Sequence, residues 1–270
     1  MINIYGSIGY TILKHSNYNK IIVFADMHDT LKSCENKINI SSWMLTKFKS
    51  SSILLEEVPR EDVELKELWT NAEHTQELKN LYLQYPNNIK PIDIRPFLIP
   101  FSYEILNEVS GKLYDITLKE YLTDINDFFN FKNKYLLKNL SNYNLDKLLN
   151  TKLGHHFIKI KKTYLNLLID IHNKINNKIR DLYKLNYKYL NNISMLLNFI
   201  MEWYICANID LLKEKPIIVH AGLFHSENII TLLSKFYNYS IVYNMGKNKL
   251  MDNKEEQGCI NLPLNYNALF

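Results

Sequence analysis

Short apolar runs separated by longer amphipathic stretches form the main pattern of this chain. Four runs are rich in β-branched residues and nearly all apolar where Pro or Lys does not edge them, namely 20–25, 52–55, 89–94 and 217–219. Strands of a parallel sheet have this composition because helices cover both of their faces. Two weaker runs, 10–14 and 240–243, flank the four. The pattern predicts a sheet whose strands alternate with helices.

Helical spacing fills the regions between the runs. Apolar residues recur every three or four positions in 41–49, 60–83 and 225–237. From 102 to 215 the chain shows no convincing strand, and its apolar spacing is helical. We therefore expect an α/β fold in which a mostly parallel central sheet is flanked by helices. We expect one domain over 1–270, a large all-helical insertion at about 102–215, and a loop from 247 onward.

Composition excludes several classes of protein. With 47% hydrophobic residues and only 7 glycines, the chain has enough apolar material for a core and too few turn residues for a β-sandwich. The net charge of +4 comes from dispersed lysines, which argues against a nucleic-acid surface. No apolar stretch is long enough for a membrane span.

The three cysteines, Cys34, Cys206 and Cys259, are scattered and form no CxxC pair. This spacing favours free thiols in a reducing compartment, with Cys34 a structural thiol. We accordingly expect an intracellular, cytoplasmic protein.

Ionisable residues follow all four strong strands. The first is followed by Asp26 and His28, the second by Glu56 and Glu57, the third carries Asp93 and Arg95 at its end, and the fourth is followed by His220 and His225. Ligands of open α/β sheets bind outside the carboxyl ends of the strands. The endings therefore predict that these side chains converge at one edge of the sheet.

Two of the endings share a form. Ala25 and Gly222 each begin a small-x-x-His sequence, which ends at His28 and His225 respectively. Together with Glu56, the two imidazoles make a donor set suited to a divalent metal ion with open positions for water or substrate.

These motifs resemble the superfamily that includes TraB, the Tiki proteases, the haem-uptake protein ChaN and the erythromycin esterases. That group places a Gly-x-x-His after an early strand, a Glu after the next and a second His motif after a late strand, and 25–28, 53–56 and 222–225 match those places. The Asp93-x-Arg95 strand resembles the esterase branch. A closer likeness is to uncharacterised proteins of large DNA viruses, through Asp26-x-His28, Cys34, Asp93-x-Arg95 and 221–226.

The chain also departs from the group. Ala25 replaces the first Gly, and the Glu that the esterases place three residues before the His is absent. The likeness to Tiki implies a metal-dependent hydrolase, and the likeness to ChaN implies binding without catalysis.

We assign candidate roles on this basis. His28, Glu56 and His225 are expected to hold a divalent metal, or to act as base and orienting group without one. Asp26 and His220 are either further catalytic groups or partners that orient His28 and His225. Whether Glu56 or Glu57 faces the site stays open, and His74 receives no role.

Asp93 and Arg95 are candidate substrate-binding residues, although an internal salt bridge between them is an equal alternative. The leading hypothesis is a metal-dependent hydrolase of amide or ester bonds that acts on a small molecule or a peptide. The alternative is a non-catalytic ligand-binding or virion-associated protein on the same fold. A metallophosphoesterase is less favoured, because the Gly-Asp and Gly-Asn-His endings of that class are absent.

Overall fold

The computed structural model describes residues 1–58, 72–95, 123, 150, 152–174 and 187–270. The chain divides into two compact units. Unit 1 comprises Met1–Glu57, Trp69–Ile92 and Asn208–Phe270, and unit 2 comprises Val58–Leu68 and Asp93–Ala207. Each unit is described by itself.

A six-stranded sheet forms the centre of unit 1, in the order β6-β5-β7-β3-β2-β8. Its strands are β2 (Gly9–Lys14), β3 (Ile21–Asp26), β5 (Ser52–Leu55), β6 (Ile89–Pro91), β7 (Ile217–Gly222) and β8 (Ser240–Gly246). The four strands from β6 to β3 run parallel, whereas β2 is antiparallel to both β3 and β8. The sheet is therefore mostly parallel, as the sequence predicts, with antiparallel pairing at one side. All residues of β3 and β7 are buried, which explains their continuous apolar runs.

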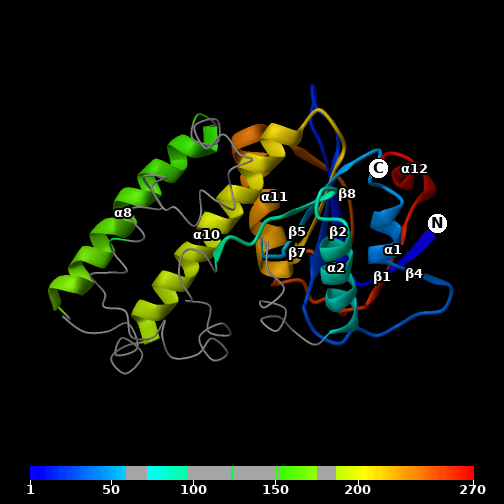
Figure 1. The fold of residues 1–270 in the computed structure, drawn as a ribbon, viewed down its shortest axis with the longest axis horizontal. Coiled ribbons are helices and arrows are strands. Elements are labelled where there is room, and N and C mark those ends of the chain that lie inside the picture. Colours follow the sequence, from blue (N-terminus) through cyan, green and yellow to red (C-terminus); the bar gives the residue numbers. More distant parts are fainter. Residues whose placement is uncertain (59–71, 96–122, 124–149, 151, 175–186) are drawn as a thin grey trace. The chain divides into compact units, whose positions relative to one another are not determined.

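Helices cover the two faces of this sheet (Figure 1). On one side lie α1 (Ile40–Leu45) and α2 (Glu73–Gln84), and on the other α11 (Leu223–Tyr237) packs against β3 and β7. The core beneath α1 and α2 contains Phe24, Trp43 and Leu78. The predicted helix at 41–49 is shorter in the structure because turns replace it after Leu45. The first part of the predicted helix at 60–83 falls outside the described residues.

A second, three-stranded sheet has the order β4-β1-β9, from β4 (Lys37–Asn39), β1 (Ile2–Tyr5) and β9 (Cys259–Leu262). The prediction of a loop from 247 onward agrees with the structure up to 258 and is wrong beyond it, because β9 pairs antiparallel with β1 and the short helix α12 (Leu264–Asn267) follows it. Ile4, Ile260 and Leu262 are buried in the same core as Phe24. Ile260 and Leu262 alternate with partly exposed residues along β9, and pairing with β1 orders this segment.

In unit 2 the described residues include α8 (Lys152–Lys174) and most of α10 (Tyr187–Leu212). The rings of Phe157 and Trp203 stack with centroids 4.1 Å apart. Both helices fall in the stretch predicted to be a helical insertion. Much of that stretch lies outside the described residues, so the insertion stays a prediction. No helix in the described part of the chain is long and apolar enough to cross a membrane.

A disulfide joins Cys34 to Cys259, while Cys206 is a buried free thiol. The expectation that Cys34 is a free structural thiol is therefore wrong. The two partners lie 225 residues apart in the sequence, and β9 carries Cys259 next to β1. The prediction of a reducing compartment rested on unpaired cysteines, so the disulfide removes its basis.

Candidate functional site

Three adjacent strands deliver the central residues of the candidate site. In the sheet, β7 lies between β5 and β3, and all three are parallel. His28 follows β3, Glu56 follows β5, and His225 lies in the first turn of α11, which begins directly after β7. Their carboxyl ends therefore meet at one edge, as the strand endings predict.

Glu56 connects the two histidines. Its Oε2 lies 3.5 Å from His28 Nε2, and its Oε1 lies 3.6 Å from His225 Nε2. The backbone N–H of Gly222 donates a hydrogen bond of 2.6 Å to Oε2. Gly222 is the N-cap of α11, so the carboxylate lies at a helix N-terminus, where a negative charge is stabilised.

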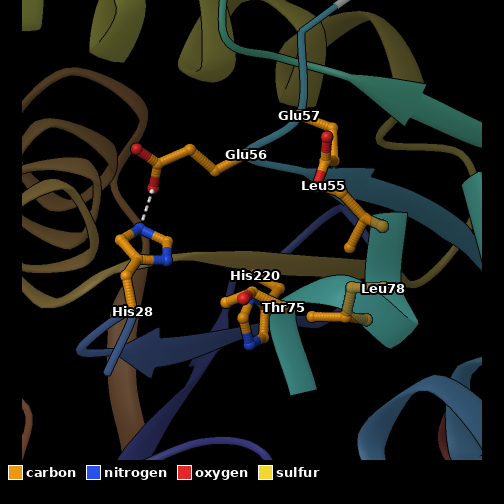
Figure 2. Close-up of a pocket in the computed structure, with 7 residues that line it drawn as sticks. All are labelled: His28, Leu55, Glu56, Glu57, Thr75, Leu78 and His220. Carbon is orange, nitrogen blue, oxygen red and sulfur yellow. Dashed lines mark ion pairs between the residues drawn. The ribbon is translucent and has the colours of Figure 1, made fainter. Parts of the chain in front are cut away.

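The structure shows which of the two candidate glutamates contacts the histidines. Figure 2 shows the Glu56 side chain reaching His28, whereas the Glu57 side chain lies across the pocket near Leu55. Glu57 is also buried and lines the same pocket. Glu56 is therefore the residue that contacts His28 and His225.

His28 is held between two carboxylates. Its backbone is left-handed, with φ of 49°, and its Nδ1 lies 3.0 Å from Asp26 Oδ2, while Nε2 faces Glu56. Burial lowers the pKa of His28, but hydrogen bonds and charge from Asp26 and Glu56 outweigh this and raise it well above its ordinary value. In the metal-free protein His28 is thus an imidazolium at neutral pH.

Asp26 ends β3 and is almost fully buried. Burial alone would raise the pKa of Asp26, but its contacts with His28 and His74 outweigh this effect and hold the pKa well below its usual range. His74 Nε2 lies 2.7 Å from Asp26 Oδ1. Asp26 is therefore a carboxylate between two imidazoles.

The sequence predicts no role for His74, because its neighbours in the chain form no motif. His74 lies in the first turn of α2, which packs over the sheet, and its side chain is 1% exposed. Only the three-dimensional fold brings it to Asp26, which is 48 residues earlier.

His220 lies on β7 and is also buried. Its Nε2 lies 3.1 Å from the carbonyl oxygen of Gly6, and burial lowers its pKa, so it is neutral at neutral pH. The structure places His220 in the lining of the pocket beside His28, with its Nε2 directed to the backbone of Gly6.

Polar and apolar side chains together line the pocket next to this cluster (Figure 2). Leu55 and Leu78 contribute apolar lining, and Thr75 adds a hydroxyl from α2. His28, Glu56, Glu57 and His220 line the rest. Such a mixture suits a small organic group that also carries a polar bond.

Asp93 and Arg95 form an internal ion pair in unit 2. Arg95 Nε donates to Asp93 Oδ1 and its terminal nitrogen donates to Oδ2, both at 2.8 Å. Arg95 also donates to Asn198 Oδ1 at 3.1 Å. The salt bridge that the sequence suggested is present, and the role in substrate binding stays a prediction.

The spacing of His28, Glu56 and His225 bears on whether they fit a metal ion. N···O separations of 3.5 and 3.6 Å exceed an ordinary hydrogen bond. They are close to the roughly 3.4 Å between two ligand atoms that a tetrahedral ion holds with bonds of about 2.1 Å. Asp26 on Nδ1 leaves Nε2 of His28 as the nitrogen that faces Glu56, the arrangement common for metal-binding histidines. The residues therefore fit an ion, although no group of three or more His, Cys, Asp or Glu among the described residues is already arranged as a metal site.

Comparisons with protein-family models, with curated proteins and with solved structures found no match to this chain.

Proposed function

We propose that the protein is a hydrolase of amide or ester bonds that uses a divalent metal ion held by His28, Glu56 and His225. The observation that carries this proposal is the placement of two imidazole Nε2 atoms against the two oxygens of one buried carboxylate. When bound, a divalent ion lowers the pKa of water and polarises a carbonyl oxygen.

The surrounding residues hold these three groups in place. Asp26 fixes the ring of His28 through Nδ1, and the Gly222 N–H fixes Oε2 of Glu56. Because α11 begins at Leu223, the same glycine turn sets the position of His225. Such partners orient ligands and raise metal affinity.

The substrate would be a small molecule or a peptide with an apolar group next to the bond that is cut. Leu55 and Leu78 would contact the apolar group, and the Thr75 hydroxyl would donate or accept a hydrogen bond. The buried position of Glu56 and His225 keeps bulk water away from the reacting bond.

Elemental analysis tests the proposal. The parent protein, a His28→Ala, His225→Ala double variant and a His15→Ala, His155→Ala control would be dialysed against Zn²⁺, Mn²⁺ or Mg²⁺ and analysed for bound metal. We expect one equivalent in the parent and control and none in the site variant, followed by turnover in a screen of ester and peptide substrates. No metal in any of the three proteins would overturn the metal-dependent proposal. It would favour the alternative, a ligand-binding or virion-associated protein on this fold.

A further inference from the structure

We propose that His74 is a positioning residue for this site: it holds the Asp26 carboxylate in the orientation that directs His28 toward Glu56. The test by metal binding rests on the proposed function. The contacts from which the inference is argued all lie within unit 1.

The first step is the bridge made by Asp26. Oδ1 lies 2.7 Å from His74 Nε2, and Oδ2 lies 3.0 Å from His28 Nδ1. The two oxygens of one carboxylate thus connect a helix histidine to the loop histidine. A rotation of the carboxylate about its Cβ–Cγ bond would break both contacts together.

The second step concerns what restrains that rotation. Oδ1 also accepts a hydrogen bond of 2.8 Å from the backbone N–H of Met27. His74 and Met27 together fix Oδ1, and this leaves Oδ2 for His28. The Met27 N–H alone restrains the oxygen from within the same loop, whereas His74 fixes it to α2 and hence to the core.

The third step is the environment of His74 itself. Its ring meets the Tyr5 ring edge-on, with centroids 6.3 Å apart. Gly6, with φ of 107°, lies so close that a Cβ there would be 3.1 Å from His74 Cβ. Among the described residues Nδ1 has no hydrogen-bond partner, so the single polar contact of this buried ring is with Asp26. Buried polar groups are normally hydrogen-bonded, and here that bond connects α2 directly to the Asp26 carboxylate.

Two substitutions separate positioning from packing. His74→Gln keeps an N–H donor near the place of Nε2, whereas His74→Leu fills similar space without a donor. With Zn²⁺ as the probe, we expect calorimetry to show affinity about tenfold to hundredfold weaker for His74→Leu and within about threefold of the parent for His74→Gln. Leu81→Ala, on the same helix, is the control for a loss of packing. It removes a core side chain of α2 and leaves the contact between His74 and Asp26 in place.

Crystal structures of the metal-free variants give a readout that needs no metal. We expect the His28 Nδ1 to Asp26 Oδ2 distance to exceed about 3.5 Å in His74→Leu and to stay at hydrogen-bond length in His74→Gln. Unchanged Zn²⁺ affinity and unchanged Asp26 geometry in His74→Leu would overturn the inference. A loss of Zn²⁺ affinity in Leu81→Ala or in His74→Gln as large as the loss in His74→Leu would also overturn it. If the parent binds no Zn²⁺, the proposed function fails, and the Asp26 geometry still decides the role of His74.

Discussion

Gly222 and Glu56 are joined by a hydrogen bond of 2.6 Å from the glycine N–H to Oε2, and this bond connects the end of β7 to the residue after β5. A Cβ at position 222 would lie 3.1 Å from His28 Nε2 and 3.4 Å from Glu56 Oε2. The glycine therefore keeps clear the space between the two groups. Any residue can adopt its backbone conformation, with φ of −53°. Glycine is needed here because a larger side chain would crowd His28 and Glu56.

Gly222→Ala should separate function from stability. The added methyl group would push His28 away from Glu56 by a few tenths of an ångström. We expect Zn²⁺ affinity to fall at least about tenfold, while the free energy of unfolding falls by less than about 1 kcal/mol, because glycine is a better N-cap residue than alanine by only that much. Calorimetry and urea unfolding would measure the two effects. If the variant binds Zn²⁺ with the parent's affinity, the space between His28 and Glu56 is not needed for metal binding.

Glu56→Gln and Glu57→Gln form a matched pair. Glu56 contacts both histidines, whereas Glu57 lies across the pocket, so only the first change removes the carboxylate between the imidazoles. We expect about a tenfold or greater loss of Zn²⁺ affinity for Glu56→Gln and less than about threefold for Glu57→Gln. The reverse order would move the metal proposal from Glu56 to its neighbour.

The strand endings made the grouping of the central residues of the candidate site predictable. Buried parallel strands have continuous apolar sequences, so the ends of β3, β5 and β7 can be recognised, and their polar residues must meet at one edge. This is why the convergence of His28, Glu56 and His225 could be predicted without a structure. Their order in the sheet, with β7 between the other two, was not needed for the prediction.

Contacts between distant segments were not predictable in the same way. His74 reaches Asp26 only because α2 packs on the sheet, and no local pattern marks that position. Cys34 and Cys259 likewise carry no spacing signal, and β9 forms only by pairing with β1. Pairing and packing across 48 to 225 residues depend on the whole fold and not on periodicity along one segment.

The disulfide should stabilise the segment that carries His28. Cys34 lies six residues after His28, and Cys259 anchors it to β9. Reduction, or Cys259→Ala, should lower the free energy of unfolding by about 2–4 kcal/mol. Without the disulfide, the unfolded chain regains the conformational freedom that the cross-link removes. Urea unfolding with and without reductant measures this. The unfolded, unreduced parent should expose one thiol, that of Cys206, and three reactive thiols before reduction would contradict the disulfide.

The pH dependence of stability tests the charge on His28. Asp26 and Glu56 raise its pKa above the ordinary value of 6.5 against the opposing effect of burial, so the folded protein holds this proton more tightly than the unfolded chain. The resulting stabilisation is fully present below pH 6.5 and is lost as the pH rises through the folded pKa. Asp26 stays ionised well below its ordinary value of 3.8, which keeps the contribution intact under mildly acidic conditions.

Urea unfolding of the metal-free parent and of His28→Gln, in the presence of a chelator, measures that contribution as a difference. We expect the parent's advantage to be largest between about pH 4 and pH 6 and to decrease steadily above pH 6.5. His155→Gln, which changes an exposed histidine, should show no such trend. A constant difference between parent and His28→Gln across this range would mean that His28 is not held as an imidazolium, and the two carboxylates would then need another cation between them.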